Sequence, residues 1–167
     1  LINFFRQFKV KIFKAEKIKT HGGSLRIFIT KKNKPNIHES IKKILKEEET
    51  YGIKKFITYK NFGKKIIEIK KNVLKNIKIL KKRDNKIIGY GSPAKASTAL
   101  NFFGISEQID FIVEDNKLKH NKFVPGVNIP IYNKNKIRKL KPTILVLAWN
   151  FFKEIKENNK DLSNKFI

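Results

Sequence analysis

The chain has no cysteine and only three histidines, which limits the metal and redox chemistry that it can carry. Without cysteine it forms no disulfide and no thiolate site. His21, His38 and His120 are dispersed, which argues against a zinc site. No apolar run approaches the roughly 18 residues that span a membrane, and the first residues are too polar for a secretory signal. We therefore expect a cytoplasmic protein without a metal or a membrane partner.

Methionine is absent and arginine is scarce, whereas lysine is abundant. Since the chain begins at Leu1, we expect a fragment of a longer protein. Only four of the 39 basic residues are arginine, and the net charge is +25. A basic chain can bind nucleic acid or an anionic membrane, but base-specific proteins rely on arginine forks. Because the lysines are spread along the whole chain, we interpret them as a solvated surface and keep nucleic-acid binding as an alternative.

The first half predicts a hairpin followed by helices. Residues 9–14 alternate lysine with apolar side chains and residues 24–31 are rich in β-formers, so we expect an antiparallel pair. A short helix is expected at 1–8, and longer helices at 37–50 and 54–83. The longest helix carries an apolar stripe that predicts a packing face, formed by Tyr59, Phe62, Ile66, Ile69, Val73 and Leu80.

The second half alternates strands with helices. Strands are predicted at 86–90, 108–113 and 143–148, with a short extended piece at 129–131. Helices are predicted at 94–103, 133–140 and 151–158. This order is typical of a small doubly wound α/β unit with a parallel sheet.

A glycine turn joins the first of these strands to its helix. Residues 89–98 read GYGSPAKAST, which contains G-x-G-x-x-A, the small-residue pattern of a dinucleotide-type phosphate turn. Lys95 lies in the first helical turn, where a cation opposes the helix dipole, and a bound anion would explain it. A purely structural tight turn is the alternative interpretation.

Three further segments carry candidate site residues. Glu114 follows the second strand, about 25 residues after the first glycine, near the spacing of a ribose-binding acid. The alternative interpretation is a polar residue that merely ends the strand. Asn150 follows the third strand, where it either contacts a ligand or caps the next helix. His21 lies beside two glycines at the hairpin, where it takes a proton or is simply a loop residue.

Four segments together resemble the C-terminal part of S-adenosylmethionine-dependent C-methyltransferases that act on nucleotide-linked deoxysugars. They are THGGSLR at 20–26, GYGSPAK at 89–95, KFVPG with IPI at 122–131, and WN at 149–150. Their order and spacing match the family over most of residues 16–155. The chain departs from the family pattern with Ser92 in place of alanine, Ala96 in place of glycine and Glu114 in place of aspartate.

The resemblance implies an α/β fold with a C-terminal Rossmann-like parallel-sheet domain at 84–167. A helical connector at 34–83 would precede it, and residues 1–33 would be the terminal hairpin of an incomplete class I methyltransferase domain. The zinc-binding region, the main S-adenosylmethionine site and the main catalytic base would lie outside this chain. In the whole enzyme, a base would remove a proton next to a sugar keto group, and the enolate carbon would take the donor methyl.

The resemblance also assigns roles to particular residues. His21 is the one catalytic candidate, and the expected contacts to the nucleotide sugar are Gly89, Gly91, Ser92, Ala94, Lys95, Glu114 and Asn150. The alternatives are a non-catalytic nucleotide-binding module and a basic nucleic-acid-binding protein.

Overall fold

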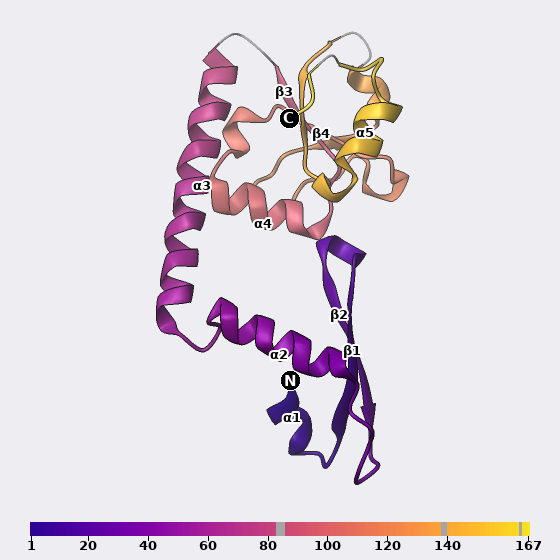
Figure 1. The fold of residues 1–167 in the computed structure, drawn as a ribbon. Coiled ribbons are helices and arrows are strands. Elements are labelled where there is room, and N and C mark those ends of the chain that lie inside the picture. The colour runs from indigo at the N-terminus through magenta and orange to yellow at the C-terminus, as the bar shows by residue number, and fades with distance from the viewer. Residues whose placement is uncertain (83–85, 138–139, 164) are drawn as a thin grey trace. The chain divides into compact units, whose positions relative to one another are not determined.

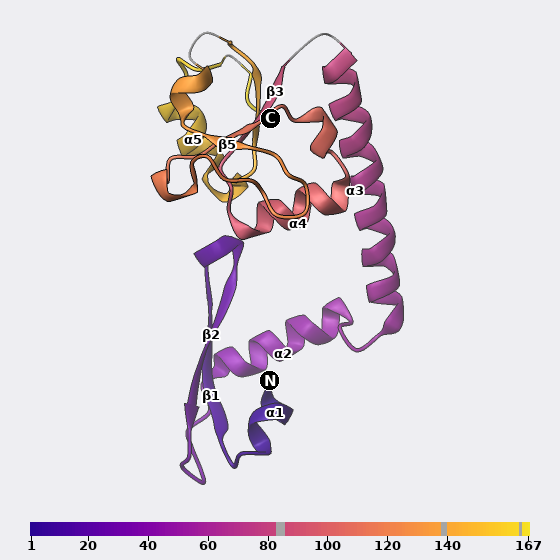
Figure 2. The ribbon, with the colours of Figure 1, turned by 180° about the vertical axis from the view of Figure 1, so that it is seen from behind.

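The computed structural model describes residues 1–82, 86–137, 140–163 and 165–167, which form two compact units (Figures 1 and 2). The first unit is Leu1–Lys64 and the second is Lys65–Ile167. The predicted boundaries at 33/34 and 83/84 remain predictions, and the second of them falls on residues outside the described ranges.

An antiparallel hairpin forms the centre of the first unit, as predicted. Strand β1 (Lys11–Ile18) pairs with β2 (Ser24–Thr30), with Lys11 opposite Thr30. β1 begins later than the predicted strand at 9–14. The reason is a turn after α1 (Ile2–Arg6), in which Lys9 has a φ of 52° and the Val10 N–H donates to the Phe5 carbonyl.

The helix α2 (Glu39–Tyr51) packs on this hairpin, and both of its ends are encoded locally. At its start, the Nδ1 atom of His38 accepts a hydrogen bond from the Ser40 N–H at 3.1 Å. At its end, Gly52 takes the left-handed conformation with a φ of 75°. Its Ile41 meets Ile12 and Ala15 of β1 in a small apolar core.

The second unit is built on a four-stranded parallel sheet. The strand order is β5-β4-β3-β6, formed by β3 (Ile87–Tyr90), β4 (Ile112–Val113), β5 (Ile131–Tyr132) and β6 (Thr143–Val146). Residues 165–167 extend the sheet beyond β6, because the Ile144 N–H donates to the Lys165 carbonyl and the Ile167 N–H donates to the Ile144 carbonyl, each at 2.9 Å. The predicted parallel α/β arrangement is confirmed.

Helices cover both faces of this sheet (Figure 1). One face packs against α4 (Ala94–Phe103) and the C-terminal part of α3 (Phe56–Lys82), through Leu100 and Ile77. The other face packs against α5 (Phe152–Asn158) and the short helix η4 (Lys134–Ile137). The strands are apolar on both faces because both are covered, as expected for parallel strands.

Three expectations for these elements need correction. The predicted strand at 108–113 is reduced to β4, since residues Ser106–Gln108 form the 3₁₀ helix η2. In place of the predicted helix at 133–140, the structure has the 3₁₀ helix η4, and residues 138–139 lie outside the described ranges. The Asn133 side chain accepts a hydrogen bond from the Asn135 N–H, which favours a tight turn over a regular helix. The stripe on α3 packs only at its C-terminal end, since Tyr59 and Phe62 are each 58% exposed.

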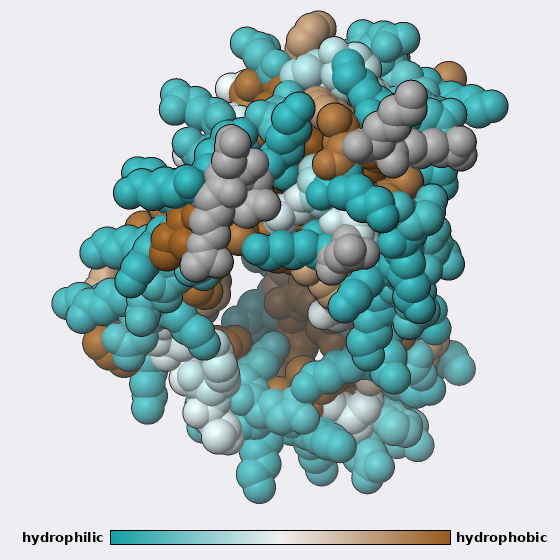
Figure 3. Space-filling model, turned by 90° about the horizontal axis from the view of Figure 1, so that it is seen from above, coloured by the Kyte–Doolittle hydropathy of each residue, from teal (hydrophilic) through white to brown (hydrophobic). Residues whose placement is uncertain are grey.

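On the face drawn in Figure 3, hydrophilic side chains dominate and apolar side chains form separate patches. Among the described residues, no helix combines the length and apolar character needed to cross a bilayer. The longest helix, α3, is interrupted throughout by lysine.

Candidate functional site

The glycine turn lies at the carboxyl end of β3, where its two glycines allow neighbouring strands to approach closely. A Cβ atom on Gly89 would lie 2.7 Å from Cγ1 of Ile112 and 2.8 Å from Cδ1 of Leu147. Gly91 has a φ of 84°, and a Cβ atom there would lie 2.9 Å from the Cβ of Ala148. Packing therefore favours glycine at position 89, and both packing and the left-handed backbone favour it at position 91, whatever the turn binds.

The amides of these glycines are already used by the sheet. The Gly89 N–H donates to the Phe111 carbonyl at 2.9 Å, and the Gly91 N–H donates to the Val113 carbonyl at 2.8 Å. A backbone N–H is a single donor. Gly89 and Gly91 thus shape the turn, and neither offers a free N–H to a phosphate.

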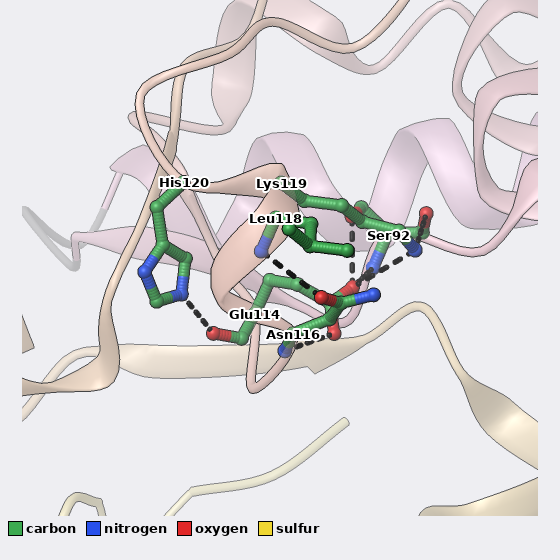
Figure 4. Close-up of polar contacts among 6 residues, drawn as sticks. All are labelled: Ser92, Glu114, Asn116, Leu118, Lys119 and His120. Carbon is green, nitrogen blue, oxygen red and sulfur yellow. Dashed lines mark hydrogen bonds and ion pairs between the residues drawn. The ribbon is translucent and has the colours of Figure 1, made fainter.

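The next residue, Ser92, is bound by a carboxylate from the neighbouring strand (Figure 4). The Ser92 N–H and the Ser92 hydroxyl both donate to Oε2 of Glu114, each at 2.8 Å. The Asn116 N–H donates to Oε1 of Glu114 at 3.2 Å. The Glu114 side chain is only 13% exposed. Its carboxylate therefore lies against the backbone of the turn instead of being displayed to solvent.

Lys119 completes this arrangement from the 3₁₀ helix η3 (Lys117–Lys119). Its Nζ lies 3.4 Å from Oε2 of Glu114 and donates to the Ser92 carbonyl at 3.0 Å. Partial burial acts to raise the pKa of Glu114, but the hydrogen bonds from Ser92 and Asn116 and the charge of Lys119 outweigh it. The net effect lowers the pKa of Glu114 below its ordinary value, so the carboxylate is charged near neutral pH.

The loop after β4 is fixed by two further hydrogen bonds. Nε2 of His120 lies 2.7 Å from the Glu114 carbonyl. Because a carbonyl only accepts, Nε2 carries the hydrogen. Oδ1 of Asn116 accepts from the Leu118 N–H at 3.0 Å and caps η3. The sequence prediction missed Lys119 and His120, for which the only signal was a pair of polar residues in a loop.

Lys95 and Trp149 come together from two neighbouring strand ends, those of β3 and β6. The Nζ of Lys95 lies 4.2 Å from the centre of the Trp149 ring, which is a cation–π contact. Trp149 is 49% exposed. Ala94, also exposed, begins α4, and the first amides of a helix have no intrahelical partner. The site therefore presents a held ammonium group beside the start of a helix.

Asn150 is exposed next to Trp149 and does not cap the following helix. It lies inside the 3₁₀ helix η5 (Trp149–Phe151), and α5 starts two residues after it with Phe151 at its N-cap position. The capping interpretation of Asn150 is therefore wrong. His21 lies in the first unit, in the 3₁₀ helix η1 (Thr20–Gly22), where it is exposed and has a φ of 55°.

A second polar cluster, centred on the Tyr90 hydroxyl, lies beside the glycine turn. The Tyr90 hydroxyl, on the last residue of β3, lies 2.9 Å from Oδ2 of Asp115 and 3.3 Å from Oδ1 of Asn159. Burial, with the hydrogen bond and charge of Asp115, raises the pKa of Tyr90 well above its ordinary range. Tyr90 is thus a neutral donor that ties β3 to the end of β4.

The geometry of the second unit agrees with a comparison against protein families. The family described as the C-methyltransferase C-terminal domain matches residues 19–166. The chain belongs to this family. A curated relative is the C-methyltransferase NovU of Streptomyces niveus, which is 27% identical over 164 residues; the match covers 96% of this chain and 39% of the relative. The chain thus spans about two fifths of the length of that relative.

The family implies S-adenosylmethionine, but the glycine turn of this C-methyltransferase C-terminal domain does not fit that cofactor. A Rossmann turn that seats a nucleoside in the turn itself uses the turn amides and a free acid at a strand end. Here Glu114 is hydrogen-bonded to Ser92, and the glycine amides are bonded within the sheet. Within the described ranges, no three histidine, aspartate or glutamate side chains converge as a metal site.

Proposed function

We propose that this chain is part of an S-adenosylmethionine-dependent C-methyltransferase, and that its second unit binds a nucleotide-linked keto-deoxysugar substrate. Membership of the C-methyltransferase C-terminal domain family supports the reaction class. The relative, itself a C-methyltransferase, supports it further. We assign the methyl donor to residues outside this chain, because the glycine turn does not fit it.

The contact between Lys95 and Trp149 is the observation that carries the binding role. The ammonium is held at the carboxyl ends of β3 and β6, which is the edge where open α/β sheets bind ligands. In our proposal, Lys95 contacts a phosphate of the substrate, and the backbone of Ala94 contributes from the first turn of α4. Asn150 supplies amide donors and an acceptor beside them.

The remaining candidate residues have smaller roles in this proposal. Gly89 and Gly91 allow the close packing that places Lys95. Ser92 and Glu114 fix the shape of the turn. His21 remains a candidate for proton transfer or for holding a polar part of the sugar. The chain's own task is then to bind and orient the nucleotide sugar.

The Lys95→Ala variant of the whole enzyme tests this role. Loss of one charge-assisted contact costs about 1.5–3 kcal/mol, so kcat/KM for the nucleotide sugar should fall by about 10- to 150-fold. The control is Lys75→Ala, an exposed lysine of α3 in the same unit, which should leave kinetics unchanged. Equal kinetics for the two variants would refute the phosphate role of Lys95.

A binding measurement separates substrate recognition from catalysis. Trp149 is the only tryptophan of the 167-residue chain and lies against Lys95, so in that chain its fluorescence reports on this site directly. We expect nucleoside diphosphate sugars, tested as the thymidine, uridine and guanosine forms of glucose, to change Trp149 emission in a saturable way. Lys95→Ala should weaken that response, and Lys75→Ala should not.

A further inference from the structure

We infer that Glu114 is a specificity determinant, because its carboxylate occupies the phosphate-binding position of the glycine turn and excludes a ligand phosphate from Ser92. The direction of phosphate to Lys95 rests on the proposed function, whereas the block of the turn by Glu114 does not.

The amide taken by Glu114 is the one that a dinucleotide-type turn presents to a ligand. In the G-x-G pattern, the second glycine lets the backbone come close to a pyrophosphate, and the N–H group that follows Gly91 belongs to Ser92. That N–H and the Ser92 hydroxyl both donate to Oε2 of Glu114 at 2.8 Å (Figure 4). Pro93 comes next and has no N–H. The turn from Gly91 to Pro93 therefore has no donor left for a phosphate.

The charges around the turn lead to the same conclusion. Lys119, the cation closest to Ser92 in this cluster, lies 3.4 Å from Oε2 of Glu114 and is paired with it. A phosphate at Ser92 would meet the negative charge of Glu114 at short range, without a free cation to offset the repulsion. Lys95 differs, since its ammonium contacts an aromatic ring and no carboxylate among the described residues. The turn thus keeps a phosphate-binding shape while its binding position is filled from within.

Removing this carboxylate should create a phosphate site. We expect Glu114→Ala, which empties the position, to give the 167-residue chain saturable binding of inorganic phosphate and pyrophosphate. Glu114→Gln removes the charge but keeps an amide oxygen that can accept from Ser92, so it should gain weaker binding. The gain should appear as a rise in Tm of about 4 °C or more at saturation, compared with chloride at equal ionic strength. The amide resonance of Ser92 should shift in the same titration. Adding Lys119→Ala to either variant should abolish the gain.

The control is Glu107→Ala, which changes the net charge as Glu114→Ala does but at an exposed residue of η2. This variant and the unmodified chain should show no specific response to phosphate. A Tm response in the unmodified chain equal to that of the Glu114 variants would overturn the inference, as would its absence from both variants. The role of Lys95 is tested separately, by Trp149 emission with nucleotide sugars, whereas the role of Glu114 is tested by the Tm with phosphate. Failure of one proposal is therefore distinguishable from failure of the other.

Discussion

Gly91→Ala should destabilise the second unit by more than the replacement of a glycine in the left-handed conformation would alone explain. Gly91 has a φ of 84°, and forcing an L-residue into left-handed backbone costs about 1–2 kcal/mol. The new Cβ would also lie 2.9 Å from the Cβ of Ala148, well inside the usual 3.5–4.0 Å separation of carbon atoms. Overpacking of this kind costs about 1–3 kcal/mol, so the total is about 2–5 kcal/mol.

A matched variant separates the two contributions. Gly104 ends α4 with a φ of 66°, but a Cβ there has no neighbour within 4 Å. Gly104→Ala should therefore cost only the backbone contribution of about 1–2 kcal/mol. Ala148→Gly in the Gly91→Ala background removes the atom that clashes, and a double-mutant cycle should recover about 1–3 kcal/mol as a coupling energy.

The assay is urea unfolding followed by the fluorescence of Trp149, the only tryptophan, which lies next to Ala148 in the second unit. The expected order of stability is the unmodified chain, then Gly104→Ala, then Gly91→Ala. The reasoning is refuted if Gly91→Ala is no less stable than Gly104→Ala, or if Ala148→Gly restores nothing. Either result would mean that β3 and β6 adjust to the extra methyl group at no cost.

Two further predictions concern the same unit. The pKa of Glu114 is lowered in the folded state. Its contribution to stability is therefore present above the unfolded pKa of about 4.3 and is lost as the pH falls through the lower folded pKa. Between pH 6 and pH 3, Glu114→Gln should lose less stability than the unmodified chain in urea titrations. Deleting residues 165–167 removes three backbone hydrogen bonds to β6, which should cost about 3 kcal/mol and expose a strand edge. Unfolding curves and light scattering measure both effects, and a truncated chain that stays monomeric with unchanged stability would contradict the second.

The strands and helices that position the site were predictable because their signals are local. The apolar pair Ile87–Ile88 before GYGSP marks the start of β3, and the run Thr143–Ala148 is apolar enough to predict a buried strand. The sequence predictions were wrong where a tight turn stands in place of a regular helix or strand. At η5, one 3₁₀ turn moves the start of α5 to Phe152, which removes Asn150 from the capping position.

The contacts within the site were not predictable, because they join residues far apart in the chain. A carboxylate after a strand has the same sequence signature whether it faces a ligand or its own backbone. The direction of the Glu114 carboxylate is set by donors on Ser92, 22 residues earlier, and by Lys119 in the following loop. Lys95 meets Trp149 only because β3 and β6 are neighbours in the sheet. Sequence spacing alone fixes neither side-chain direction nor strand order.

The contact with Trp149 changes what the position of Lys95 implies. A cation in the first turn of a helix is unfavourable by about 0.3–1 kcal/mol, whereas a partly exposed cation–π contact contributes about 0.5–1 kcal/mol. The two effects nearly cancel, so a bound anion is not needed to explain why lysine is tolerated there. If Lys95 contacts no ligand, Lys95→Ala leaves stability unchanged, because the two effects nearly cancel, and also leaves the response to nucleotide sugars unchanged. If it serves the ligand, Lys95→Ala leaves the free energy of unfolding within about 0.5 kcal/mol and still weakens the response to nucleotide sugars, because the tolerated charge is the one that the substrate contacts.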